Sequence, residues 1–222
     1  MRLKWDELSR LSAVEMFAAT QVQQMGLTAE IRRDWGWLRA HYGIRKALYN
    51  PTFDPDLVRL DPNSWWLCLK SRGEMIGCQA IAIFSDTSLG RLMRTGRLWS
   101  RDGFDVDGLV APVADEISGS FSYGGVMWVE PSWRQRRIAF YMTAINRVHI
   151  LRNHDVRLVT GTVLEEMTHH RMITYDYPPD QIEPVFRGRL PFMGETSWYV
   201  CHMTADQAMD RIGDHIAQAQ AA

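Results

Sequence analysis

The sequence has little cysteine and no long apolar run. Its 222 residues include three cysteines, which lie far apart and have no Cys-x-x-Cys spacing of the kind that indicates a zinc site. We expect Cys68, Cys78 and Cys201 to be reduced and mostly buried, as in a cytoplasmic protein, and we expect no bound metal. No apolar stretch approaches the roughly 18 residues of a membrane span, and the start, MRLKWDELSR, lacks the apolar region of a signal peptide.

A strong net charge is also missing. The formal net charge is −1 at pH 7, which argues against a general binder of nucleic acid or of a membrane surface. The composition is 46% hydrophobic and 23% charged, as in a globular protein with a sizeable core. We predict a single domain over residues 1–222, with helices in 1–60, an insertion at 86–118 and a central unit at 123–177.

The segments around the central unit carry helix and strand signals. Ser12–Glu15 is a capping box that predicts a helix ending near Gly26, and Thr28 is expected to cap a second helix that ends at Gly43. Parts of the 86–118 insertion are helical in pattern, and it is interpreted either as a lid or as a packed connector. The remaining patterns predict a loop at 50–55, strands at 64–70, 75–84, 184–192 and 196–203, and helices at 164–177 and 205–219.

The central unit reads as a strand, a basic turn, an amphipathic helix and a second strand. The apolar strand 126–129 stops at Pro131, a helical pattern with one apolar stripe starts near Arg136, and a strand resumes at 157–160. The start of a helix presents N–H groups that have no partner within the helix, so this turn is a candidate anion site. A solvated basic turn and a patch for nucleic acid are the alternatives.

These residues resemble the GCN5-related N-acetyltransferase (GNAT) superfamily. That family has a Q/R-x-x-G-x-G/A signature after a strand that ends V-x-P. Here Val129-Glu130-Pro131 fits the strand end, and the stretch from Arg134 to Ala139 fits the signature at both of these residues. The chain departs from the signature at Arg137, where the family usually has glycine. The resemblance implies an α/β (α+β) fold, with a mixed, mostly antiparallel central sheet flanked by helices.

The resemblance also implies a site for acetyl-CoA or another acyl-CoA within 123–177. The turn would hold the pyrophosphate, and backbone groups of the preceding strand would bind the pantetheine arm. Two alternatives stand for Arg137: it keeps an ordinary helical φ and adds charge to the phosphate contact, or its side chain fills the site. The implied binding residues are Met127, Trp128, Val129, Arg134, Gln135, Arg136, Arg137, Ile138 and Ala139.

The resemblance further implies direct transfer of the acyl group to an amine. The family often places a tyrosine on the next helix, and Tyr175 matches it as the general acid, although Thr168 and Arg171 depart from the accompanying pattern. Tyr177 is a nearby substitute. Glu130, at the end of the central strand, is a candidate base that would work through a water molecule.

The sequence therefore predicts an acyl-CoA-dependent N-acyltransferase, most simply an N-acetyltransferase, whose acceptor is a small-molecule or protein amine. No nucleic acid or membrane partner is expected, and the edge strands of such a sheet are compatible with a homodimer. The first alternative is a GNAT-fold binding or regulatory protein that has lost catalysis. A homoserine-lactone synthase shares the fold, but its motifs are not evident here.

Overall fold

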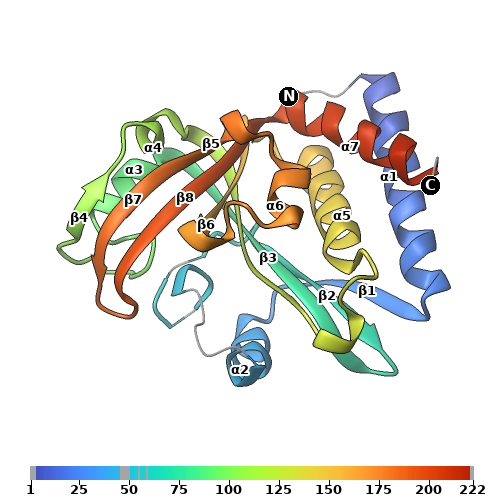
Figure 1. Ribbon diagram of the computed structural model, residues 1–222, viewed down its shortest axis with the longest axis horizontal. Coiled ribbons are helices and arrows are strands. Elements are labelled where there is room, and N and C mark those ends of the chain that lie inside the picture. The colour runs from blue at the N-terminus through green and yellow to red at the C-terminus, as the bar shows by residue number, and fades with distance from the viewer. Residues whose placement is uncertain (1–3, 46–50, 55, 59, 221–222) are drawn as a thin grey trace.

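The computed structural model describes residues 4–45, 51–54, 56–58 and 60–220, and its strands form one eight-stranded sheet (Figure 1). The strands are β1 (Leu27–Arg32), β2 (Trp65–Ser71), β3 (Glu74–Ser88), β4 (Asp107–Val110), β5 (Ser118–Val129), β6 (Leu158–Leu164), β7 (Ile182–Leu190) and β8 (Gly194–Thr204). The helices are α1 (Trp5–Gln24), α2 (Trp35–Arg45), α3 (Leu89–Arg94), α4 (Val113–Glu116), α5 (Ile138–Asn153), α6 (Arg171–Asp176) and α7 (Ala205–Gln220).

The strand order is β1-β2-β3-β5-β6-β8-β7-β4. Among the described residues, β5 and β6 form the parallel pair, and every other neighbouring pair is antiparallel. The predicted fold class, a mixed and mostly antiparallel sheet flanked by helices, is confirmed. The parallel pair sits near the middle of the sheet and is joined by α5, so the predicted strand–turn–helix–strand unit forms the centre of the molecule.

Two apolar cores cover the two faces of the sheet. Successive residues of β2 alternate between them: Trp65 and Leu67 belong to the first core, and Trp66 and Cys68 to the second. The first core lies under α1, α5 and α7, which pack against one another (Figure 1). The second core includes side chains of α3 and α4. Burial on both sides explains why the central strands are apolar along most of their length.

The prediction of a helix that starts at Thr28 is wrong. The segment Leu27–Arg32 forms β1, which pairs antiparallel with β2 from Leu27↔Ser71 to Arg32↔Trp66, and helix α2 begins only at Trp35. The apolar spacing in this segment suits a helix, but pairing with the free edge of β2 prevails over that local preference.

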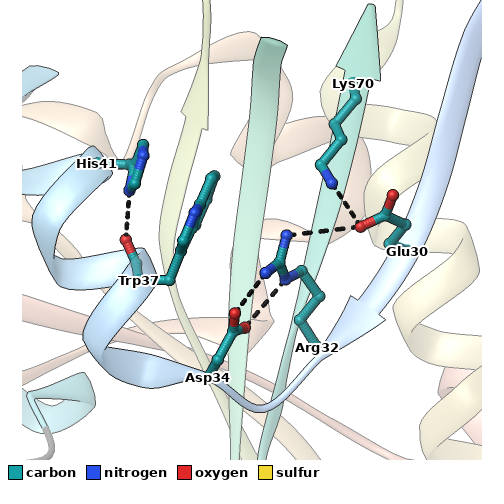
Figure 2. Close-up of polar contacts among 6 residues, drawn as sticks. All are labelled: Glu30, Arg32, Asp34, Trp37, His41 and Lys70. Carbon is teal, nitrogen blue, oxygen red and sulfur yellow. Dashed lines mark hydrogen bonds and ion pairs between the residues drawn. The ribbon is translucent and has the colours of Figure 1, made fainter. Parts of the chain in front are cut away.

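Side chains at the end of β1 fix α2 against the sheet (Figure 2). The guanidinium of Arg32 lies over the rings of Trp37, at 4.6 Å, and Trp66, at 5.2 Å. Asp34 accepts two hydrogen bonds from the same guanidinium, which orients it. Cation–π contacts of this kind stabilise by about 0.5–2 kcal/mol each. The N-terminal segment is therefore attached to the sheet by side chains as well as by strand pairing.

Other boundaries also moved. Leu164 still pairs with Trp198 in the sheet, so the helix predicted at 164–177 is reduced to α6, after a 3-10 turn at Glu165–Met167. The 86–118 insertion holds α3 and α4 as expected, but also β4, which pairs with β7 and was not predicted. Helix α1 begins eight residues earlier than a capping box at Ser12 suggests, since its N-cap is Lys4 and its first helical residue is Trp5.

The three cysteines are free and buried, as predicted. Over the residues that the structure describes, no helix combines the length and the apolar character that crossing a bilayer requires.

Candidate functional site

The parallel strands β5 and β6 separate part-way along their length. Their pairing runs from Phe121↔Leu158 to Gly124↔Gly161 and then stops. Beyond this point β5 stays paired with β3 as far as Val129, and β6 stays paired with β8 as far as Leu164. The two strands therefore enclose a V-shaped gap, and each presents to it a backbone edge that has no strand partner among the described residues. A Cβ atom on Gly161 would lie 3.1 Å from the Gly124 carbonyl oxygen, so glycine permits the close approach at the vertex.

A bulge in β5 lies beside the gap. Val126 has φ of +52°, a left-handed conformation that is rare for a β-branched residue, and the β3–β5 register shifts between Cys78 and Ala80 opposite it. The carbonyl oxygen of Val126 accepts a hydrogen bond from the Cys78 thiol at 3.6 Å. A bulge turns backbone groups out of the regular ladder, and bulges are common next to functional sites. The Gly124-Gly125 pair directly precedes the bulge.

The gap opens toward the basic turn that leads into α5. Arg137 is the N-cap of α5 and has φ of 58° and ψ of 20°, so the alternative in which it keeps an ordinary helical φ is wrong. The chain adopts this left-handed conformation to turn from the end of β5 into the helix, and it is the conformation in which glycine costs least. The side chain of Arg137 is exposed and so is not packed into the core.

Backbone N–H groups at this turn point out of the helix start. The first helical bond recorded for α5 runs from the Tyr141 N–H to the Arg137 carbonyl oxygen, at 3.1 Å. The N–H groups of Ile138 and Ala139 come before that bond and have no acceptor within the helix. With Gln135 also in a left-handed conformation, at φ of 68°, the turn is a concave run of backbone donors suited to an anion.

Side chains of the turn fold back onto the strand end. The Nε atom of Arg134 donates to the Val129 carbonyl oxygen at 3.2 Å. The guanidinium of Arg136 lies 4.7 Å from the centre of the Trp133 ring. These contacts hold the turn against the end of β5 and leave positive charge around it.

A cavity of about 310 Å³ occupies the gap and extends on both sides of the sheet. Its lining includes the β5 segment 124–127 and the β6 segment 159–164, with Thr143, Asn146 and Arg147 from α5 on one side. Trp198 and Met193 line it from the side of the second core. Its volume suits a small ligand or one end of a larger one.

A buried chain of hydrogen bonds crosses the inner wall of the cavity. The Trp65 indole donates to the Asn146 side-chain oxygen at 2.9 Å, and the Asn146 amide donates to the Gln79 oxygen at 2.9 Å. Because both asparagine groups are engaged, its rotamer is fixed. Gln79 belongs to β3 at the register shift, so this chain connects α5 to the bulge in β5.

A buried ion pair forms another part of the lining. Arg147 and Asp176 both line the cavity, with 3.4 Å between Arg147 Nη1 and Asp176 Oδ1. Tyr177 lies next to them, and its ring centre is 5.3 Å from the guanidinium carbon. Burial raises the pKa of Tyr177 to about 12, although the Arg147 charge lowers it, so the phenol keeps its proton at neutral pH. Burial alone lowers the pKa of Arg147, but the Asp176 charge raises it overall, so the guanidinium remains charged.

The residues predicted from the sequence are distributed over both ends of this site. Met127 lines the cavity, whereas Trp128 is buried in the second core and Val129 lies at the turn. Glu130 follows the end of β5 and is not part of the cavity lining; its N–H donates to the Ile76 carbonyl oxygen at 2.8 Å. Tyr175 belongs to α6, but its side chain lies outside the described part of the structure.

Sequence reasoning missed Arg147 and Asp176 and named Tyr177 only as a substitute. Arg147 falls on the helix after the turn, and no spacing in the sequence links it to Asp176, which is 29 residues away.

The acidic and histidine residues of 165–170 do not form a metal cluster. Within the described residues, no group of three or more His, Cys, Asp or Glu side chains could hold a metal ion.

Comparison with solved structures identifies the fold. An N-acyl amino acid synthase from uncultured soil microbes, FeeM, superposes with a TM-score of 0.50 at 8% identity, over 83% of this chain and 94% of that one. The fold is the GNAT fold. Arabidopsis thaliana NAA60 in complex with acetyl-CoA aligns at 12% identity over 81% and 99% of the two chains, with a TM-score of 0.49. The Escherichia coli ribosomal-protein-S18-alanine N-acetyltransferase aligns at 10% identity over 81% and 94%, also at 0.49. No family model and no curated protein matches the sequence.

Proposed function

We propose that this protein is an acyl-CoA-dependent N-acyltransferase, with acetyl transfer to an amine as the simplest case. The observation that carries the proposal is the gap between β5 and β6, which connects a run of helix-start N–H groups at one end with a cavity at the other. A thioester of coenzyme A has this layout, because a pyrophosphate, an amide-bearing arm and a reactive carbonyl follow one another. The fold it shares with an N-acyl amino acid synthase is consistent with this chemistry.

The binding residues follow from that layout. N–H groups of Gln135 to Ala139 would hold the pyrophosphate, with Arg134 and Arg136 supplying charge nearby. The backbone of β5 from Gly125 to Val129 would hydrogen-bond the amides of the arm, as one more strand would. The thioester would then lie at the bulge, where the turned backbone groups of Val126 can polarise its carbonyl.

The reaction needs two proton movements. The acceptor loses a proton, its nitrogen attacks the thioester carbonyl, a C–N bond forms, and the C–S bond breaks to release a thiolate that takes up a proton. Tyr177 lines the cavity and keeps its proton, so it is a candidate acid beside Tyr175. Glu130 remains the candidate base, acting through water from the end of β5. Each positioned acid or base is worth about 10²–10⁴ in rate.

Calorimetry with coenzyme A tests the binding half of the proposal. Wild type is expected to bind, whereas Ala139→Trp, which places a bulky ring at the start of α5, is expected to lose binding and keep its fold by circular dichroism. Failure of the wild type to bind coenzyme A or acetyl-CoA at high micromolar concentration would refute the proposal.

Thiol release from acetyl-CoA over a panel of amines tests the chemical half. Tyr177→Phe and Tyr175→Phe, compared side by side, identify the acid, since only the residue that protonates the thiolate should lower kcat by about 10²-fold or more. Unaltered turnover in both variants would remove tyrosine from the acid role.

A second candidate function is binding without catalysis. The residues that favour it are Arg137, in a position that suits glycine, together with Thr168 and Arg171, which depart from the family pattern. Coenzyme A binding with no turnover of any amine in the panel would select this candidate.

A further inference from the structure

The guanidinium of Arg147 has an edge with no partner. Arg147 is 2% exposed, and its Nη1 atom faces Asp176. The Tyr177 hydroxyl lies close enough to raise the pKa of Arg147 through a hydrogen bond, yet the Nε and Nη2 atoms have no well-aligned hydrogen-bond partner among the described residues. A buried donor without an acceptor is costly, and the cost is larger when the donor is charged. Arg147 lines the cavity, so a ligand there is a ready source of the acceptors that the protein does not supply.

A second donor without a partner lines the same cavity. The Oγ atom of Ser122 is buried and has no hydrogen-bond partner in the part of the chain that the structure describes. Ser122 belongs to β5, before the strands separate, and Arg147 belongs to α5, so the two come from different walls. A structural ion pair accounts for one side of the guanidinium, but it accounts neither for the other side nor for this hydroxyl.

The geometry points to a substrate carboxylate. The Nε–H and Nη2–H groups lie parallel on one edge of the planar guanidinium, at the spacing of the two oxygens of a carboxylate. We therefore propose, as an extension of the proposed acyl transfer, that the cavity takes a substrate bearing a carboxylate, bound by Arg147 and assisted by Ser122. Asp176 holds the opposite side of the guanidinium and so directs the free edge toward the ligand.

Two substrates can bring this carboxylate. In one case the acyl group itself ends in a carboxylate, as in a dicarboxylic acyl thioester. In the other case the acceptor is an amino acid, whose α-carboxylate lies next to the attacking nitrogen. The group that binds is the same in both, so pairs of substrates that differ only in the carboxylate separate them.

Wild-type protein is tested first. Succinyl-CoA is compared with butyryl-CoA by calorimetry, since both acyl groups have four carbons and only one carries a carboxylate. In parallel, amino acids are compared with the amines left by their decarboxylation, by thiol release from acetyl-CoA. A preference of about 10–100-fold for the carboxylate member is expected in one of the two arms, from the strength of a charge-assisted pair of hydrogen bonds.

The variant that removes the site is Arg147→Met combined with Asp176→Asn, which avoids leaving a buried carboxylate without its arginine. It is expected to abolish the preference and to leave affinity for coenzyme A itself unchanged. The matched control is Arg152→Met on the same helix, whose guanidinium binds Glu15 on α1. That control should keep the preference.

The outcomes distinguish failure of the carboxylate site from failure of the proposed function. Wild type could bind coenzyme A and yet show equal affinity for the two acyl thioesters and equal thiol release with the two members of each acceptor pair. This result would overturn the carboxylate site and assign the free edge of Arg147 to cavity water alone, while the proposed function would survive. Absence of coenzyme A binding would overturn the proposed function and, with it, the inference. A preference that persists in the double variant would place the carboxylate elsewhere and refute the role of Arg147.

Discussion

The left-handed turn at Arg137 yields a prediction about stability that does not depend on any ligand. A residue with a Cβ atom costs about 1–2 kcal/mol in this conformation, and glycine avoids that cost. Glycine has more freedom to lose on folding, by about 0.5–1 kcal/mol. Because the Arg137 side chain is exposed and caps nothing, its removal costs little. Arg137→Gly should therefore raise the free energy of unfolding by about 0.5–1 kcal/mol.

The expected change in melting temperature follows from the size of the chain. For 222 residues, an unfolding entropy of about 2.1 cal/mol/K per residue makes 1 kcal/mol equivalent to about 2 °C. Calorimetric or denaturant unfolding of Arg137→Gly and Arg137→Ala isolates the backbone term, because both variants lose the guanidinium and only one keeps a Cβ atom. The free energy of unfolding of Arg137→Gly should exceed that of Arg137→Ala by about 1 kcal/mol.

The neighbouring residue supplies the control. Arg136 is in the same turn but is not among the residues with positive φ. The free energy of unfolding of Arg136→Gly should therefore be lower than that of Arg136→Ala by about 0.5–1 kcal/mol. The difference in free energy of unfolding between the Gly variant and the Ala variant should thus be positive at position 137 and negative at position 136. The same sign at both, or a destabilised Arg137→Gly, would refute the argument. Coenzyme A titrations of Arg137→Ala would then measure what the charge alone contributes.

Three further predictions follow from burial and close packing. Gly161→Ala should lower the free energy of unfolding by about 1–3 kcal/mol, because its Cβ would lie 3.1 Å from a carbonyl oxygen. Gly124→Ala, whose Cβ would lie 3.5 Å from the nearest carbonyl oxygen, should cost less, and denaturant unfolding that ranks the two variants in the reverse order would contradict this prediction. Burial raises the pKa of Cys201 to about 12, so a thiol reagent at pH 8 should label this cysteine only in denaturant. Fast labelling of Cys201 in the native protein would contradict the burial of its thiol. Burial lowers the pKa of His149 and His154 below 6.5, so the unfolded chain takes up more protons than the folded protein, and the free energy of unfolding should fall as pH falls from 7.5 toward 5. The urea midpoint should therefore decrease over this range, and its dependence on pH should weaken when both histidines are changed to Gln; a midpoint that rises on acidification would contradict the prediction.

Local patterns predicted well where a segment is buried on a regular face. The apolar residues of α5 repeat at a helical period, and the strand before it ends in a continuous apolar run, so both were recognisable in the residues themselves. The burial of Asn146 and Arg147, which lie outside the apolar stripe, was not. Patterns failed at the edges of the sheet. The segment after Thr28 became β1, and β4 was overlooked, because an edge strand depends on the partner it meets rather than on its own periodicity.

The turn before α5 was predicted from sequence, but its conformation was not. Strand, turn and helix are consecutive, and the resemblance from Val129 to Ala139 fixed their order. The positive φ of Arg137 and the bulge at Val126 come from the way β5 must leave β3 and enter α5, and no arginine or valine indicates such a conformation by its identity.

The sequence by itself determined the central strand–turn–helix unit, the run of N–H groups at the start of α5 and the apolar cores on both faces of the sheet. These depend on neighbours in the chain and on the repeat of apolar residues. Only the tertiary structure decided where β5 and β6 separate, and only it brought Ser122, Arg147, Asp176 and Tyr177 around one cavity. Those contacts join strands and helices that are far apart in sequence, and the burial that leaves the edge of Arg147 without a partner exists only once all of them have packed.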